Sequence, residues 1–200
     1  PDFLIIGAGI IGLTIALQLR KQFLDSIIII IEKEKKLGMH ASGRNSGVLH
    51  AGFYYSADSL KAKLCRDGNA FWRSYCLEKK LKINQCGKLV VARNKGELNG
   101  LDELYRRGQT NSIILEKITE NEAKKIEPNI YTYENALFSP TTCTIDPIEI
   151  LNSISQEVLN QNIKIIYKNK FLKKKNNIIY SEQGNYDPGY LINAAGLYAD

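Results

Sequence analysis

The sequence predicts an α/β fold built on a parallel sheet, and three features near its start predict it. Residues 3–6 form a short apolar run typical of a strand, and a glycine-rich turn over residues 7–12 follows it. Apolar residues then recur at helical spacing over residues 13–23. Residues 27–31 are five consecutive isoleucines, a composition typical of a strand buried on both faces. This succession is the βαβ unit of a doubly wound sheet.

The glycine turn has the spacing that binds a dinucleotide. Gly7 permits a tight turn, Gly9 lets the backbone approach a pyrophosphate, and Gly12 lets the helix pack closely on the strand. The unpaired N–H groups at the start of the helix then face the phosphates. Glu32 ends the second strand, where an acceptor for ribose hydroxyls is expected, although a solvated surface charge is the alternative.

The rest of the chain predicts a mixture of helices and strands. A helix follows a cap at Asp58 or Ser59 and runs to about residue 77, and a capping box at residues 119–122 opens a short helix that Pro128 ends. A further helix starts at residues 146–147 and reaches about residue 160. Other expected elements are a helix over residues 96–107, strands over 87–92, 112–115, 163–167, 170–173, 178–181 and 190–194, and a tight turn at 183–185.

Composition and charge exclude several classes of protein. The chain of 200 residues has no apolar run near the roughly 20 residues that a membrane helix needs. The four cysteines are far apart and lack the histidine partners of a zinc site, so we expect no metal. The net charge of +6 comes largely from lysine runs without interleaved aromatic residues, so we expect no nucleic-acid partner.

Residues 35–59 are the first region to suspect of function. This stretch is rich in Gly, Ser, His, Asn and Tyr, and loops of such length are commonly functional. From His40 to Gly52 it resembles the D-amino-acid-oxidase-like superfamily of flavoenzymes, and within it the L-2-hydroxyglutarate dehydrogenase/oxidase family. The segments that carry this resemblance span the chain in family order: residues 45–48, 50–52, 54–55, 59–65, 86–92, 127–128, 145–146 and 193–200.

The resemblance implies a Rossmann-type FAD-binding domain with an inserted α+β substrate domain. We expect residues 1–80 and 146–200 to form the discontinuous FAD-binding domain and residues 81–145 to form part of the substrate domain. Since family members continue well past residue 200, we expect the C-terminal portion to be missing and this part alone to be inactive. A simple strand-to-helix turn is the alternative for Gly196. The FAD-binding residues carried over are Gly7, Gly9, Gly12, Glu32, Ser42, Asn45, Ser46 and Gly196.

His50 is the candidate catalytic residue, because it is the only histidine within the small-residue segment after Asn45. It could take the substrate's hydroxyl proton or orient its carboxylate, and a structural histidine bonded to backbone is an equal alternative. A covalent link between a histidine and the flavin is a third, less favoured alternative. His40 precedes that segment, so we expect it to support the loop.

Four residues are candidate substrate contacts. Tyr54 and Tyr55 could position a carboxylate or pack beneath the loop, and Lys61 could clamp a dicarboxylate or belong to an exposed cationic face. Arg44 stands where many relatives have a histidine before the Asn-Ser-Gly triplet, so the substrate's fine identity stays open.

The implied reaction is oxidation of L-2-hydroxyglutarate, or a similar 2-hydroxy acid, to 2-oxoglutarate. The expected partners are this small molecule and an electron acceptor, which could be a quinone, another carrier or oxygen. The expected location is cytoplasmic, with a peripheral contact at the inner membrane as an alternative that the basic charge allows. The competing interpretations are a flavoenzyme that oxidises amines such as glycine or sarcosine, and a truncated inactive remnant that binds FAD.

Overall fold

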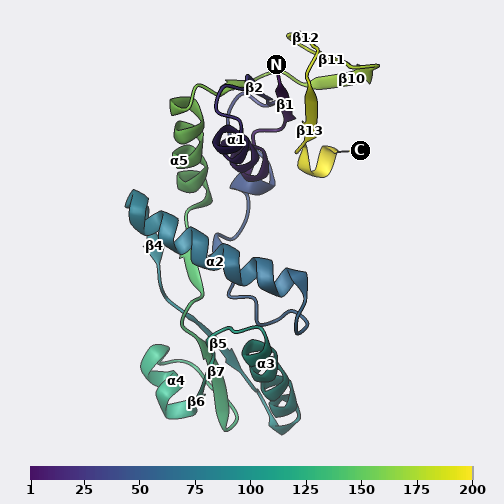
Figure 1. Ribbon diagram of the computed structural model, residues 1–200. Helices are drawn as coiled ribbons and strands as arrows, with labels where there is room; N and C mark the ends of the chain where they lie inside the picture. The colour runs from purple at the N-terminus through teal and green to yellow at the C-terminus, as the bar shows by residue number, and fades with distance from the viewer. Residues whose placement is uncertain (200) are drawn as a thin grey trace. The chain divides into compact units, whose positions relative to one another are not determined.

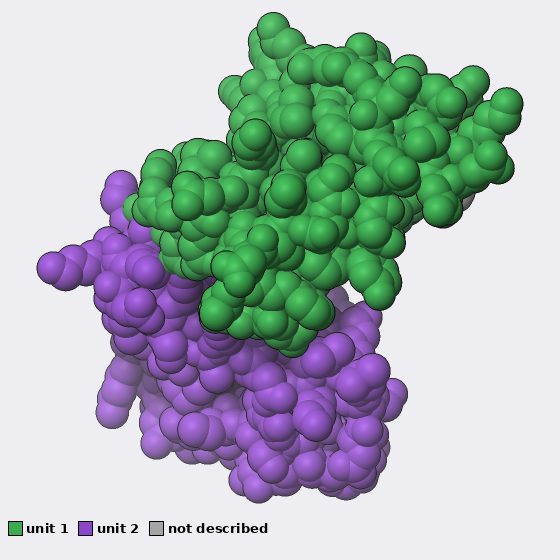
Figure 2. All heavy atoms as spheres, turned by 45° about the horizontal axis from the view of Figure 1, so that its top comes forward, with its two compact units in different colours: residues 1–45, 147–200 green, residues 46–146 purple. Residues whose placement is uncertain are grey.

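The computed structural model of this protein describes residues 1–199. They form two compact units, coloured separately in Figure 2. Unit 1 comprises Pro1–Asn45 and Pro147–Asp200, and unit 2 comprises Ser46–Asp146. Each unit contains its own sheets and its own buried apolar cluster.

A four-stranded parallel sheet forms the centre of unit 1, with strand order β13-β1-β2-β9. The register places Leu4 beside both Ile29 and Leu191. All four residues of the central β1 are buried, as the apolar runs of the sequence predict. The predicted parallel α/β sheet is therefore confirmed. Its strands are β1 (Phe3–Ile6), β2 (Ile28–Ile31), β9 (Lys164–Ile166) and β13 (Tyr190–Asn193).

Both faces of this sheet are covered (Figure 1). Successive side chains of a strand point to opposite faces. Leu4 packs with Ile179 of the small antiparallel sheet, whereas Ile5 lies beneath Gly12 of the helix layer. The helix layer consists of α1 (Ile10–Gln22) and α5 (Pro147–Asn160), and the small sheet of β10 (Phe171–Lys175), β11 (Ile178–Ser181) and β12 (Gly184–Tyr186).

Unit 2 begins with a small antiparallel sheet, in which β8 (Cys143–Ile145) lies between β3 (Val48–Leu49) and β4 (Ile83–Asn84). The long helix α2 (Leu60–Lys79) starts at Ser59, whose side chain accepts a hydrogen bond from the Ala62 N–H. The buried Asn69 of α2 donates to the backbone carbonyls of Leu49 and Thr141, at 2.9 and 3.0 Å. These bonds hold α2 against residues from the start and from the end of unit 2.

A second antiparallel sheet of unit 2 has strand order β5-β7-β6 and carries the main core. Its strands are β5 (Lys88–Val91), β7 (Asn135–Ser139) and β6 (Glu116–Thr119), and its helices are α3 (Leu98–Thr110) and α4 (Glu120–Ile126). The capping box that the sequence predicts at Thr119 and Glu122 is present. The buried cluster comprises Ala51, Phe53, Ala92, Leu101, Ile113, Leu115 and Leu137.

The structure corrects two expectations about local structure. Residues 112–115 are not a strand, because Ser112 adopts a left-handed conformation and the Ile113 N–H caps α3 by bonding to the Gly108 carbonyl. Ile113 and Leu115 are buried in the core whereas Ile114 is exposed, and strand pairing starts only at Glu116. The expected turn at residues 183–185 lies slightly earlier, since Gly184 already begins β12. The sequence did not predict the strands β3, β4, β7, β8 and β12.

The expected first domain boundary at residue 80 also differs from the division that the structure makes. The chain leaves unit 1 after Asn45 and returns at Pro147, next to the expected return at residue 146. The reason is that Ala51 and Phe53 pack into the core of unit 2, together with Leu137. Residues 46–80 therefore belong to unit 2 by packing. In the part of the chain that the structure describes, no helix combines the length and the apolar content that spanning a membrane requires.

Phe53 is the largest fully buried side chain, so its truncation tests the core of unit 2. We expect Phe53→Ala to lower the free energy of unfolding of this unit by about 3–5 kcal/mol, because a large cavity replaces the ring. Phe71→Ala is the matched control, since Phe71 is 56% exposed, and it should cost less than about 1 kcal/mol. Denaturant titration measures both, and equal losses in the two variants would contradict this packing.

Candidate functional site

The glycine turn between β1 and α1 has a conformation that side chains would prevent. Gly7 has a φ of +101°, and a Cβ at this position would lie 2.5 Å from the Ala194 carbonyl oxygen. A Cβ at Gly12 would lie 2.0 Å from the Gly7 carbonyl oxygen, so α1 approaches the turn too closely for any side chain. The first and third glycines thus have the roles that the spacing predicts.

Glu32 lies at this turn, although it is 20 residues beyond the third glycine. One of its carboxylate oxygens accepts the Ala8 N–H at 2.8 Å, and the other accepts the Glu34 N–H at 2.9 Å. The carboxylate is half-buried and keeps further lone pairs that can accept hydroxyl donors. Its position beside the turn is the one that an acceptor for ribose hydroxyls occupies.

The segment that follows β2 brings Ser42 to the same turn, and Asn45 holds that segment. The Ser42 hydroxyl accepts the Ile10 N–H at 3.1 Å, which places it at the start of α1. A Cβ at Gly9 would lie 3.0 Å from this hydroxyl. The Asn45 amide donates to the carbonyls of Ala41 and Ser42, both at 3.1 Å, and so closes the short 3₁₀ turn Ala41–Gly43.

The remaining candidates for cofactor binding are placed less closely. Gly196 has a φ of +63° and starts the 3₁₀ turn Gly196–Tyr198 after β13, but a Cβ there would meet no atom within 4 Å. Its conformation, and not crowding, therefore favours glycine. Ser46 is exposed and is the first residue of unit 2. The structure thus assembles Gly7, Gly9, Gly12, Glu32, Ser42 and Asn45 within unit 1.

The residues at this turn fit the diphosphate and ribose of a dinucleotide. Gly9 caps α1 without a side-chain hydrogen bond, and the first turn of α1 contains no acidic residue. The first turn of α1 therefore carries no carboxylate of its own at the positive end of the helix dipole. Glu32 supplies the acceptor that ribose hydroxyls need. Among residues 1–199, no group of three or more His, Cys, Asp or Glu side chains is arranged to hold a metal ion.

Beside Ser42, His40 has the supporting role that the sequence predicts. Its Nε2 lies 2.8 Å from the Glu34 carboxylate, and this hydrogen bond is the main reason why the pKa of Glu34 is lowered. The His40 ring also packs edge-on against Tyr198. These contacts stabilise the segment after β2.

His50 lies in unit 2, directly after β3. Its backbone carbonyl accepts a hydrogen bond from the Cys65 thiol at 3.2 Å, which links it to α2. Partial burial of the ring lowers the pKa of His50 below its ordinary value, and the positive charge of Lys88 lowers it further. Both causes disfavour the imidazolium, so the ring is neutral at pH 7 and can accept a proton.

Lys88 is a neighbour of His50 that sequence reasoning missed as a site residue. It starts β5, and its Nζ lies 4.6 Å from the centre of the Tyr54 ring. Tyr55 has the same arrangement with Lys61, whose Nζ lies 4.4 Å from its ring centre. Each pair places an ammonium beside a phenol, a combination that attracts and orients a carboxylate. The signal that could have found Lys88 is its place in the segment 86–92, which resembles the family.

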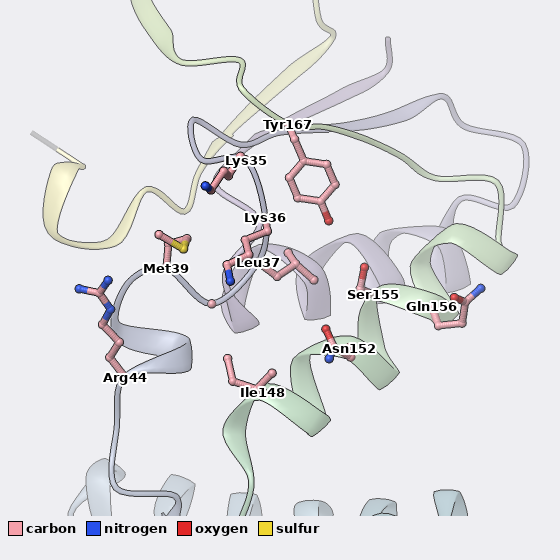
Figure 3. Close-up of a pocket in the computed structure, with 11 residues that line it drawn as sticks. Lys35, Lys36, Leu37, Met39, Arg44, Ile148, Asn152, Ser155, Gln156 and Tyr167 are labelled. Carbon is pink, nitrogen blue, oxygen red and sulfur yellow. The ribbon is translucent and has the colours of Figure 1, made fainter.

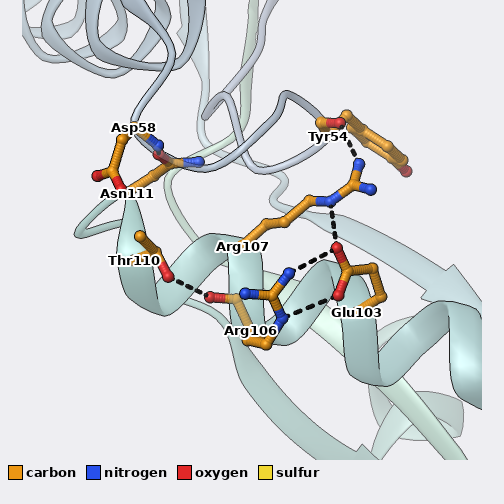
Figure 4. A network of polar contacts seen from close by, with 7 residues as sticks. All are labelled: Tyr54, Asp58, Glu103, Arg106, Arg107, Thr110 and Asn111. Atoms are coloured by element: carbon orange, nitrogen blue, oxygen red, sulfur yellow. Dashed lines mark hydrogen bonds and ion pairs between the residues drawn. The ribbon is translucent and has the colours of Figure 1, made fainter.

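The loop that carries Tyr54 is held by α3 (Figure 4). The Arg107 guanidinium donates to the Tyr54 carbonyl at 3.2 Å and to Glu103 at 2.8 Å. Hydrogen bonds from Arg106 and then Arg107 lower the pKa of Glu103 to about 2, so this carboxylate stays ionised throughout the neutral range. At the other end of the loop, the Asn111 side chain accepts the Asp58 N–H at 2.9 Å. Tyr54, Tyr55 and Lys61 lie in unit 2, whereas Arg44 lies in unit 1.

The model of a known protein family, described as FAD-dependent oxidoreductase, matches residues 2–200 of the chain. The chain belongs to the FAD-dependent oxidoreductase family. FAD is the cofactor of this family, and the glycine turn with Glu32 fits it.

Curated relatives within this family are named L-2-hydroxyglutarate dehydrogenases. The *Escherichia coli* K12 protein is 33% identical over 204 residues, which cover 100% of this chain and 48% of that protein. The human mitochondrial protein is 40% identical over 157 residues, covering 78% of this chain and 34% of that protein. The chain therefore spans about half the length, or less, of the curated relatives it matches.

Solved structures of flavoenzymes share the fold. L-α-glycerophosphate oxidase from *Mycoplasma pneumoniae*, solved with FAD bound, superposes with a TM-score of 0.86 at 25% identity and covers 100% of this chain and 55% of that one. L-proline dehydrogenase from *P. horikoshii* superposes with a TM-score of 0.85 at 22% identity, over 99% of this chain and 53% of that one. The second likeness shows the fold alone.

The position of Lys88 predicts the ionisation of His50. We expect the pKa of His50 to lie below 6.5 and to rise in Lys88→Gln, because a positive charge that disfavours the imidazolium is removed. A pH titration of the imidazole resonances by NMR measures it, and His40→Gln assigns the signals of the two histidines. Lys95→Gln is the control, because it removes a different lysine of unit 2. An unchanged pKa in Lys88→Gln would remove Lys88 from the surroundings of His50.

Proposed function

We propose that unit 1 holds FAD and that the protein oxidises L-2-hydroxyglutarate, or a similar 2-hydroxy acid, to the 2-oxo acid. The observation that carries this proposal is the turn at which Glu32 and Ser42 meet the start of α1, in a chain whose whole length resembles L-2-hydroxyglutarate dehydrogenases. Unit 2 would then belong to the substrate domain.

The proposed reaction needs a base and a binding site for carboxylates. The 2-hydroxy acid loses a hydride from Cα and a proton from its hydroxyl, and it becomes the 2-oxo acid. FAD, when bound, accepts the two electrons. The neutral imidazole of His50 would accept the hydroxyl proton, which its lowered pKa favours at neutral pH. Lys88 with Tyr54, and Lys61 with Tyr55, supply cations and phenols suited to carboxylates.

Gly9→Glu tests whether the glycine turn binds FAD. A side chain at this position starts 3.0 Å from the Ser42 hydroxyl and would bring a carboxylate to the expected place of the diphosphate. We expect the purified variant to lose its visible flavin absorbance. Gly68→Glu is the matched control, because a Cβ at Gly68 meets no atom within 4 Å and this residue lies in α2 of unit 2. A yellow Gly9→Glu protein would refute this site.

His50→Gln tests the proposed base. We expect the variant to keep FAD but to lose turnover by about 10²-fold or more, since a positioned base typically contributes this much. His40→Gln replaces the chain's other histidine and should keep most of the turnover. Steady-state kinetics of the two variants compare the roles, and similar rates would remove His50 from the chemistry.

Anaerobic reduction of the flavin tests the substrate. The protein carrying this chain is purified, freed of oxygen and mixed separately with L-2-hydroxyglutarate, D-2-hydroxyglutarate and glycine. We expect the visible flavin band to bleach with the L-hydroxy acid only. Bleaching by glycine would favour the amine-oxidising alternative. An enzyme of that kind shares the fold, since glycine oxidase from Geobacillus kaustophilus superposes with a TM-score of 0.86 at 19% identity. A flavin that no compound reduces would favour the inactive remnant.

The oxidant that returns the reduced flavin to its starting state is a separate proposal. A quinone, another carrier or oxygen would serve, and the reduced protein mixed with each in turn would show which one restores the flavin band. The peripheral contact with a membrane stays a prediction from the basic charge alone.

A further inference from the structure

Unit 1 contains a hollow that the proposed chemistry does not use. It lies between the segment that follows β2 and the helix α5, and its cavity volume is about 760 Å³ (Figure 3). This volume is in the range of pockets that bind small molecules. None of Gly7, Gly9, Gly12, Glu32 and Ser42 lines it, so the hollow is distinct from the proposed FAD site.

The charge of the hollow is positive. Lys35, Lys36 and Arg44 line it, and no aspartate or glutamate does. Within residues 1–199, none of these three cations forms an ion pair with a carboxylate. Arg44 acts electrostatically on Glu34, but the ion-pair partner of that carboxylate is His40, at 2.8 Å. The hollow therefore gathers three cations that form no direct ion pair, which favours an anionic ligand.

The helix α5 adds polar side chains to the lining of the hollow, beside the apolar Ile148. The amides of Asn152 and Gln156 project from exposed positions of α5, and each can donate hydrogen bonds to an oxyanion. The Ser155 side chain between them is only 7% exposed and is hydrogen-bonded to the Tyr167 hydroxyl. Figure 3 shows Tyr167 pointing down toward Ser155, with Lys36 and Asn152 between Arg44 and Gln156. The pair of Ser155 and Tyr167 closes the floor of the hollow.

The hollow and the proposed FAD site share one segment of chain. A Cβ at Gly43 would lie 2.2 Å from the Gly38 carbonyl oxygen, so the segment is folded tightly on itself between these residues. Lys35, Lys36 and Arg44 lie on or beside this fold and line the hollow, whereas Ser42 turns to the start of α1. A ligand bound by the two ends of the segment would restrain the part that carries Ser42.

We propose that this hollow binds a small, multiply charged oxyanion bearing phosphate or carboxylate groups, and that this ligand orders residues 35–44. Lys35, Lys36 and Arg44 neutralise the charge, and Asn152 and Gln156 donate to the oxygens. The site lies outside the proposed dinucleotide turn, so its occupancy regulates the segment that supports FAD without replacing it.

Calorimetric titration of the protein with inorganic pyrophosphate tests the site directly. FAD is present in excess, so that the glycine turn does not take up the added anion. We expect saturable binding that is about tenfold weaker in the double variant Lys35→Gln/Lys36→Gln, because two cations are removed from the hollow. The matched control is Lys174→Gln/Lys175→Gln, which loses the same charge from exposed positions of β10 in the same unit and should bind as the original protein does.

Three outcomes would overturn the proposal: no saturable binding of either pyrophosphate or citrate, unchanged binding in Lys35→Gln/Lys36→Gln, or an equal loss in both double variants, which would indicate general attraction to a basic surface. A parallel titration with citrate distinguishes the two ligand sources. Binding of pyrophosphate alone assigns a phosphate ligand, and binding of citrate alone assigns a polycarboxylate.

Hydrogen exchange measures the second half of the proposal without depending on FAD. We expect backbone amides of residues 35–44 to exchange more slowly when the bound anion is present, and this protection to be absent in Lys35→Gln/Lys36→Gln. Unchanged exchange in the original protein at saturating pyrophosphate would show that the ligand does not order the segment. If FAD does not bind, the comparison of Lys35→Gln/Lys36→Gln with its matched control still assigns the anion to the hollow, because neither readout is flavin absorbance.

Discussion

The close approach of α1 to the end of β1 is the constraint on which the rest of unit 1 depends. At Gly12 the helix comes so near the Gly7 carbonyl that a single Cβ would occupy the same space. This approach directs the start of α1 to the edge of the sheet where Glu32 ends the neighbouring strand. The helix dipole, the backbone N–H groups and an acidic acceptor then meet at one point. The proposed cofactor site follows from how closely a helix and a strand can pack.

The segment after β2 adds a second level of organisation. It has little regular structure, yet it is held at several points: Glu32 binds the Glu34 N–H, Glu34 binds His40, and Ser42 binds the start of α1. The first two bonds connect residues of this segment to one another. The third connects the segment to α1, which is distant from it in sequence. The segment thereby presents one side to the proposed FAD site and the other to the basic hollow, and a change on either side is transmitted through few residues.

Unit 2 places a neutral histidine beside cations. An imidazole next to Lys88 loses its proton more readily than an isolated one, which is the state that a general base requires. The same lysine lies over the Tyr54 ring, and Arg107 of α3 holds the Tyr54 backbone. Burial already favours the neutral imidazole, and the positive charge of Lys88 would add to this effect while also attracting an anionic substrate.

Features that depend on neighbours along the chain could be predicted from the sequence. The GxGxxG spacing, the isoleucine strand, the Ser59 cap and the capping box at Thr119 are confirmed, because each is decided within a few residues by backbone geometry or periodicity. The family resemblance likewise lay in short segments. The residues of the glycine turn could be named in advance for this reason.

Contacts between residues that are far apart in the sequence required the packed structure. The sequence predicted a strand over residues 112–115, but Ile113 and Leu115 instead fill the core that also contains Leu137 of β7. The first unit ends at Asn45 because Phe53 joins the same core. The approach of Lys88 to His50 and the hollow between Lys36 and α5 also require elements far apart in sequence to pack together. Such contacts depend on the register and packing of whole elements, which local patterns do not specify.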